Sequence, residues 1–268
     1  MNSFAKLSYL NIFRKFFIFL KYLSDNLSNG EFRLAWISFK YLIVKRSNST
    51  DTVIKSNNGL FHIRKNTIDF KLANSAYEYL VLKKFRSLLP LYNLFIDIGA
   101  NIGTYSIIAA KNGVKCIAFE PVLTNYISLK KNIQLNRLEE FIEPMMIGLA
   151  EKASKARFNY DPLKPGASSI HPIKRTSEIL EIELKVFDDL NCVSTETNKI
   201  LIKIDVEGME LNVLKGMEKI LSNKKDICLI IETKHSGDTE IKKMLNQFGD
   251  FKFENIDEFN MLATKSNN

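Results

Sequence analysis

Two acidic residues on either side of a glycine-rich turn are the first part of the sequence that could bind a small molecule. Asp97 ends an apolar run and is followed by the turn GANIG, and Glu120 ends the next apolar run. A glycine turn that opens a helix directs free N–H groups at a ligand. An acid about 20 residues later is placed to bind the ribose hydroxyls of an adenosine cofactor. The predicted cofactor-binding residues here are Asp97, Gly99, Ala100, Asn101, Gly103 and Glu120.

Two cofactors fit an acid that binds ribose. A dinucleotide site favours the pattern G-x-G-x-x-G, whereas this turn has Asn101 at the second glycine position. Asp97, two residues before the turn, would also repel a pyrophosphate. S-adenosylmethionine carries no phosphate, and its ammonium and sulfonium groups favour nearby carboxylates. The sequence therefore favours S-adenosylmethionine, with a nicotinamide dinucleotide as the alternative.

A second acidic cluster lies in the segment IKIDVEGME. Asp205 is expected to line the cofactor site and Glu207 to open the next helix, where free N–H groups stabilise a carboxylate. Lys203, inside a buried strand, requires an anionic partner, either Asp97 or Asp205. A purely structural role for these groups stays open. Glu210 is expected to be solvated.

The segment IIETKH supplies a candidate acid-base pair. His235 is the predicted general base, because an imidazole is mostly neutral at pH 7 and accepts a proton readily. Glu232 would orient it, and Glu207 completes the predicted catalytic group. Together with Asp205, these residues would also suit Mg²⁺ or Mn²⁺. No compact ligand motif supports that alternative, and we expect no metal.

Short apolar runs alternate with helical segments from residue 94 onward, which is typical of a parallel sheet covered on both faces. Helices are expected over 102–112, 122–135 and 207–221. We therefore predict an α/β fold with a doubly wound, mostly parallel sheet. Because parallel strands end at one edge of the sheet, the acidic residues should meet there. The loop DPLKPGASSI is expected to cover the acceptor, with Ser168 and Ser169 as hydrogen-bonding groups.

Residues 1–50 are expected to form a basic, aromatic-rich helical extension to a catalytic domain over 51–268, dispensable for cofactor binding. The extension has eight lysines and arginines against two acids, so it carries a net charge of +6. No run in it is long enough to span a membrane or serve as a signal peptide. A helical pair packed on the protein or a second subunit, and a peripheral membrane contact, are both open. No base-reading motif accompanies the charge, so we expect no nucleic acid. Three scattered cysteines indicate free thiols and a cytoplasmic protein.

Five motifs together resemble the FkbM family of S-adenosylmethionine-dependent methyltransferases. They are FIDIGANIGTYS, FEP, LKKNIQLN, GASSI and LIKIDVEGMELNVLKG, and the resemblance covers about residues 75 to 235. It implies a Rossmann-like class I fold and methyl transfer to a hydroxyl, usually on sugars of bacterial glycans, glycolipids or natural products. A nicotinamide oxidoreductase and a non-catalytic membrane or assembly module remain as alternatives.

Overall fold

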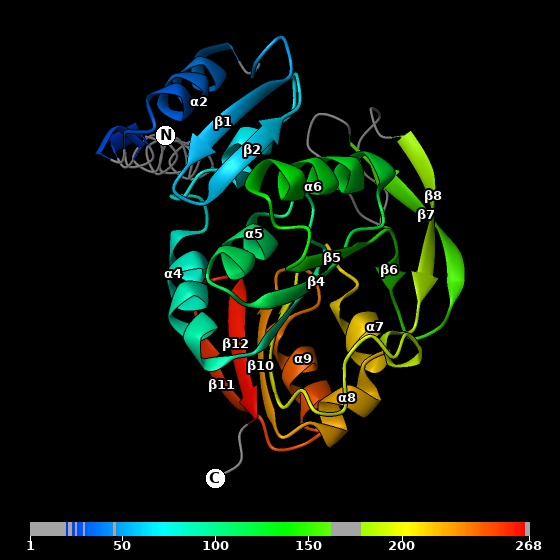
Figure 1. Cartoon of the computed structure of the whole chain (residues 1–268). Helices are drawn as coiled ribbons and strands as arrows, with labels where there is room; N and C mark the ends of the chain where they lie inside the picture. The colour runs from blue at the N-terminus through cyan, green and yellow to red at the C-terminus, as the bar shows by residue number, and fades with distance from the viewer. Residues whose placement is uncertain are drawn as a thin grey trace, which may run out of the picture. The chain divides into compact units, whose positions relative to one another are not determined.

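The computed structural model describes residues 20, 23–24, 26–28, 30–44, 47–161 and 178–265 (Figure 1). The chain divides into two compact units, residues 1–79 and residues 80–268. This division falls later than the boundary expected at residue 50, so 51–79 belong with the extension in the structure. That only residues 51–268 are needed for cofactor binding stays a prediction.

The first unit combines one helix with a hairpin. It contains α2 (Phe32–Val44), β1 (Thr52–Ser56), β2 (Gly59–Ile63) and α3 (Asp69–Leu72). The backbone N–H of Asn57, in the hairpin turn, donates to Glu31 Oε1 at 2.6 Å, just before α2 begins. Arg64 and Asp69 form a bidentate ion pair behind the hairpin, with Asp69 fully buried. The hairpin is therefore held to α2 and α3, which is why the unit extends past residue 50.

The second unit is built on a seven-stranded sheet of order β11-β12-β10-β9-β3-β4-β5. Neighbouring strands from β10 to β5 are parallel, and β12 is antiparallel to both of its neighbours. This confirms the predicted fold. The strands are β3 (Leu94–Ile98), β4 (Lys115–Phe119), β5 (Ile142–Met145), β9 (Lys199–Ile204), β10 (Asp226–Glu232), β11 (Lys252–Asn255) and β12 (Asn260–Lys265).

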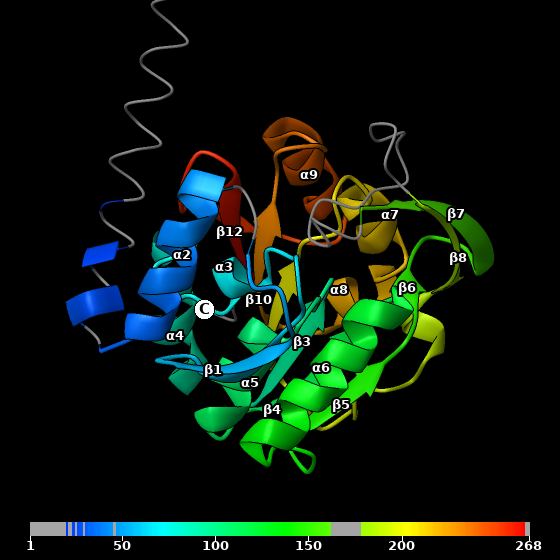
Figure 2. The same ribbon diagram turned by 90° about the horizontal axis from the view of Figure 1, so that it is seen from above.

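Helices cover both faces of this sheet (Figures 1 and 2). On one face, Phe95 of β3 contacts Phe85 of α4, which in turn contacts Tyr105 of α5. On the other, the alternate residues Ile96 and Ile98 belong to the core shared with α7, α8 and α9. The helices are α4 (Tyr79–Leu88), α5 (Thr104–Lys111), α6 (Leu123–Asn136), α7 (Glu210–Lys215), α8 (Glu218–Asn223) and α9 (Asp238–Leu245). The single helix expected over 207–221 is thus wrong, since two helices begin at Glu210 and Glu218.

The irregular stretch after β5 forms a small second sheet. Its strands are β6 (Gly148–Leu149), β7 (Ser154–Tyr160) and β8 (Glu178–Lys185), in the order β6-β8-β7. Ser168 and Ser169, assigned to an acceptor loop, lie outside the described residues. All three cysteines are free, with Cys116 and Cys228 buried and Cys192 partly buried.

Candidate active site

The turn after β3 is held against the ends of both neighbouring strands. The N–H groups of Gly99 and Ala100 both donate to the carbonyl of Phe119 at 3.0 Å. On the other side, a Cβ on Gly99 would lie 1.9 Å from the carbonyl oxygen of Asp205, and its φ is +86°. The space left by the missing side chain of Gly99 is thus filled by the β9–α7 loop. Gly99 thereby brings the first turn and the second acidic cluster together.

Substituting alanine at Gly99 is expected to destabilise the protein more than the same change at Gly113. Both glycines have φ near +80°, but a Cβ on Gly113 meets nothing within 4 Å. Gly113→Ala should therefore cost only the strain of the left-handed conformation, about 1–2 kcal/mol. Gly99→Ala should add about 1–3 kcal/mol for the overlap with Asp205. Urea unfolding measures both variants, and equal losses would contradict the packing role of Gly99.

Asp97 stabilises the start of α5 from within the protein. It is buried and accepts two hydrogen bonds at Oδ2, from the Ser106 N–H at 3.1 Å and the Ser106 hydroxyl at 2.6 Å. Burial raises the pKa of Asp97, while the charge of Lys203 and the bonds from Ser106 oppose that shift. Asp97 therefore has a structural function at this turn. A direct contact with the cofactor stays a prediction.

Glu120 fastens the glycine turn to the segment after β4. Its Oε2 accepts from the Asn101 N–H at 2.9 Å, and its Oε1 accepts from the Val122 N–H at 3.0 Å and from Asn125 Nδ2 at 3.3 Å. Glu120 therefore holds the glycine turn in place, and its contact with the ribose hydroxyls stays a prediction.

The turn also contains a buried acceptor, on Asn101, that can be compared with the hydrogen-bond donors of the cofactor. The Oδ1 atom of Asn101 is buried and has no hydrogen-bond partner among the described residues. Asn101 also has a φ of +51°, in the left-handed region. Glu120 and Asn101 thus offer acceptors to a ligand that presents hydroxyl or ammonium donors. These acceptors fit the hydroxyl and ammonium groups of S-adenosylmethionine. Gly103 packs against α6, because a Cβ on it would lie 2.4 Å from Leu129 Cδ1, and its contact with the cofactor stays a prediction.

Lys203 joins the two acidic clusters. Its ammonium forms an ion pair with Asp205 Oδ2 at 2.6 Å and lies 4.6 Å from the centre of the Tyr105 ring. The Lys203 side chain is buried, whereas that of Asp205 is 29% exposed. Of the two partners considered for Lys203, Asp205 therefore makes the direct contact. Asp205 keeps an open side at the edge of the sheet.

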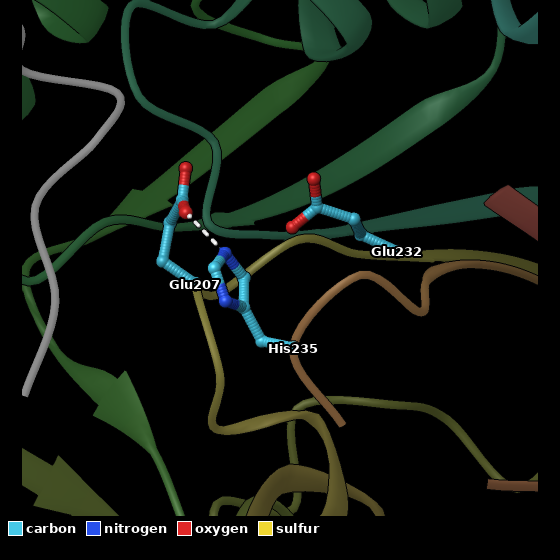
Figure 3. A group of neighbouring side chains, drawn as sticks. All are labelled: Glu207, Glu232 and His235. Atoms are coloured by element: carbon cyan, nitrogen blue, oxygen red, sulfur yellow. Dashed lines mark hydrogen bonds and ion pairs between the residues drawn. The ribbon is translucent and has the colours of Figure 1, made fainter. Parts of the chain in front are cut away.

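The predicted catalytic residues meet between two loops (Figure 3). Glu207 lies in the β9–α7 loop with a φ of +51°; the helix that it was expected to open begins only at Glu210. His235 Nε2 lies 3.2 Å from Glu207 Oε2. Glu232 lies beside this pair, and one ligand atom from each of the three residues falls within 4.8 Å of the others. The carboxylate that contacts His235 is thus Glu207, whereas the sequence assigned this role to Glu232.

Both carboxyl groups ionise well above the usual range. Burial, followed by the negative charge of Asp205, raises the pKa of Glu207 to about 7 and that of Glu232 to about 8. Glu232 Oε2 is buried and has no hydrogen-bond partner among the described residues. The raised pKa of Glu232 extends its protonated form, which can donate a hydrogen bond, towards neutral pH. The spacing of these three residues would also suit a divalent cation.

The elevated pKa of Glu232 predicts a pH-dependent effect of Glu232→Gln on stability. A folded-state pKa of about 8, above the ordinary 4.5, means that folding takes up a proton between these values. The contribution of Glu232 to the free energy of unfolding is full below about pH 4.5 and is lost as the pH rises to about 8. The neutral glutamine avoids this loss. The melting temperature of the variant, relative to wild type, should therefore increase from about pH 5 to about pH 8.5. A difference that stays constant would contradict the shift.

Glu210 is a site residue that the sequence did not reveal. It is 0% exposed, not solvated as expected, because it accepts hydrogen bonds from the Gly208 N–H at 3.0 Å and from the Ser236 hydroxyl. Gly208 follows Glu207 and Ser236 follows His235, so Glu210 fixes the two loops beside the catalytic pair. The function of Glu210 in holding these loops is visible only in the structure, where the two loops meet.

Three comparisons place the chain among known proteins. The model of the methyltransferase FkbM domain matches residues 97–259. Methyltransferase sdnD of Sordaria araneosa is 30% identical over 49% of this chain and 62% of its own length. Hexuronic acid methyltransferase AglP of Haloferax volcanii is 28% identical over 56% of this chain and 60% of its own. A crystal structure of methyltransferase FkbM from Methylobacillus flagellatus is 16% identical over 74% of this chain and 56% of that one, with a TM-score of 0.47.

The chain spans about 60% of the length of these two curated relatives. The family match covers more than half of the chain, and it begins at Asp97 and includes the glycine turn, Glu120, both loops and His235. The chain therefore belongs to the FkbM family of methyltransferases, which use S-adenosylmethionine as the methyl donor.

Proposed function

We propose that the protein is an O-methyltransferase that methylates a hydroxyl of a sugar in a glycan, glycolipid or natural product. The observation that carries the proposal is the contact of 3.2 Å between His235 and Glu207 at the sheet edge where the cofactor turn lies. When bound, S-adenosylmethionine supplies an electrophilic methyl group. An alcohol has a pKa far above 7, so a base must take its proton as the new bond forms.

His235 is the base in this proposal and Glu207 orients it. When Glu207 is ionised, it accepts the Nε2–H of His235, which leaves Nδ1 unprotonated and able to take the hydroxyl proton. The carboxylate also stabilises the imidazolium that results. The His235 side chain is exposed, so an acceptor can reach it. This assignment corrects the predicted roles, because Glu207 replaces Glu232 as the orienting residue.

A sugar acceptor matches the polar groups around this pair. Asp205 is an acceptor with an open side, and Glu232, whose pKa is raised to about 8, is a donor when it is protonated. Adjacent hydroxyls of a sugar both donate and accept, so they can bind the two groups at once. The similarity to a protein named as a hexuronic acid methyltransferase also supports a sugar. Asp205 and Glu232 would then select the acceptor, and His235 would activate it.

The direct test is transfer of a labelled methyl group from S-adenosylmethionine to sugars. We expect label in neutral or uronic acid-containing glycans and glycolipids, and none in RNA. Label in RNA alone would contradict the proposal. Thermal unfolding separates the competing classes: S-adenosylhomocysteine should raise the melting temperature, whereas stabilisation by NAD alone would indicate an oxidoreductase. No stabilisation by either ligand would indicate a non-catalytic module.

A further inference from the structure

Helix α2 exposes an apolar stripe on one face. Phe32, Trp36, Phe39 and Ile43 are 68%, 64%, 39% and 65% exposed. Their spacing of four, three and four residues places them along one side of the helix. The rings of Trp36 and Phe39 lie 6.1 Å apart along it. A continuous patch of this kind marks an interaction surface more often than a scatter of single residues does.

The opposite face of α2 already supplies the core of the first unit. Leu34, Ala35 and Ile37 are buried, and the Arg33 side chain donates to the Val53 carbonyl of the hairpin at 3.2 Å. The helix is thus fixed in its unit by one face, and the exposed stripe is not needed for that packing. Among the described residues, the stripe is therefore left available for a partner.

The charge of this region distinguishes between two partners. Residues 1–50 carry eight lysines and arginines against two acids. One of those acids, Glu31, is buried and bonded to the Asn57 N–H, so it does little to offset the surface charge. In the described part of this region, α2 carries Arg33 and Lys40 and no acid, so a second copy of the helix would bring like charges together. An anionic lipid surface would instead be attracted to them.

We propose that this face of α2 binds the surface of an anionic lipid bilayer, with Phe32, Trp36, Phe39 and Ile43 inserted at the level of the headgroups. Aromatic rings, tryptophan above all, favour that depth, and neighbouring cations bind the lipid phosphates. None of the helices in the described part of the chain is long and apolar enough to span a membrane. The helix therefore lies along the surface. If the proposed function holds, such a contact would recruit the chain to the surface that carries membrane-bound acceptors.

The sequence provides its own probe, because Trp36 is the only tryptophan of the chain. Tryptophan fluorescence of the full-length protein should shift to shorter wavelength on addition of vesicles containing phosphatidylglycerol, and brominated lipid should quench it. Vesicles of phosphatidylcholine alone should produce a much smaller shift. Because the attraction is partly electrostatic, binding should weaken about 10-fold or more when salt is raised to about 1 M.

Variants distinguish vesicle binding through this face of α2 from nonspecific adsorption of the protein to vesicles. The double variant Phe32→Ser/Ile43→Ser should lose vesicle binding by about 10-fold or more, with the melting temperature unchanged, because both side chains are exposed. Ile127→Ser is the matched control, since Ile127 is 56% exposed on α6, and it should bind like wild type. Vesicle binding without a change in Trp36 emission would overturn the proposal. So would a shift that depends on protein concentration without lipid, since that indicates a second copy.

Discussion

Replacing His235 by alanine is expected to lower the turnover number by about 10² to 10⁴, the usual contribution of a positioned general base. The affinity for S-adenosylmethionine should change little, because Asn101 and Glu120, the proposed acceptors for the cofactor, lie in the loops after β3 and β4, whereas His235 follows β10. Steady-state kinetics and calorimetric titration of the cofactor measure the two quantities separately. A large loss of cofactor affinity would move His235 from catalysis to binding.

Glu207→Gln is the control for this assignment. Glutamine keeps the size of the side chain but does not stabilise the imidazolium, so the loss in turnover should be smaller than that of His235→Ala. In wild type, kcat/KM should rise with pH as Glu207 ionises, because the carboxylate that orients His235 and stabilises its imidazolium then forms; the pKa of Glu207 is about 7. This rise in kcat/KM should be altered in Glu207→Gln, which cannot ionise. If the glutamine variant is inactive while His235→Ala is active, the carboxylate is the base.

Replacing Glu120 by alanine should weaken the binding of S-adenosylmethionine by about 1.5–3 kcal/mol, the range for hydrogen bonds to a charged group. This corresponds to about a 10- to 150-fold increase in Kd. Two effects contribute: the ribose hydroxyls lose their acceptor, and the Asn101 N–H that Glu120 holds at 2.9 Å is released, which loosens the turn. Titration calorimetry of purified variants checks the affinity.

The matched control is Glu120→Gln, which keeps the shape and one carbonyl acceptor. It should lose less affinity than Glu120→Ala, although its amide cannot accept from both Asn101 and Val122 as the carboxylate does. Thermal unfolding without ligand should reveal a lower melting temperature for Glu120→Ala, because buried N–H groups lose their acceptor. Unchanged cofactor affinity in a folded Glu120→Ala would contradict the predicted ribose contact.

The sheet and the edge that carries the site were predictable because both depend on local patterns. Apolar runs of five to seven residues between helical segments form the parallel strands β3, β4, β9 and β10. Parallel strands share their carboxyl edge, so Asp97, Asp205 and Glu232 had to end there. The hairpin at Asn57-Asn58-Gly59 also follows from its turn residues, as the pairing of Ser56 with Gly59 confirms.

The partners of individual side chains were not predictable, because loops that are distant in sequence decide them. Glu207 is close to His235 only because its loop adopts a φ of +51° and the helix starts at Glu210 instead. Glu210 is buried because Ser236 arrives from the next loop. The packing of Gly99 was not predictable for the same reason, because the group that a Cβ on Gly99 would meet is the carbonyl of Asp205, in a loop distant in sequence. The unit boundary likewise depends on the hairpin's contact with α2, which no composition change marks.

The most direct test of the proposed chemistry is the type of bond formed by the transferred methyl group. A hexuronic acid carries both hydroxyls and a carboxylate, and only a hydroxyl needs a base such as His235 for methylation. The protein would be incubated with ¹³C-methyl-labelled S-adenosylmethionine and a uronic acid-containing glycan, and the product treated with dilute alkali. We predict a methyl ether that survives the alkali and whose formation is lost in His235→Ala. A methyl ester that the alkali releases, formed equally well by His235→Ala, would contradict the account.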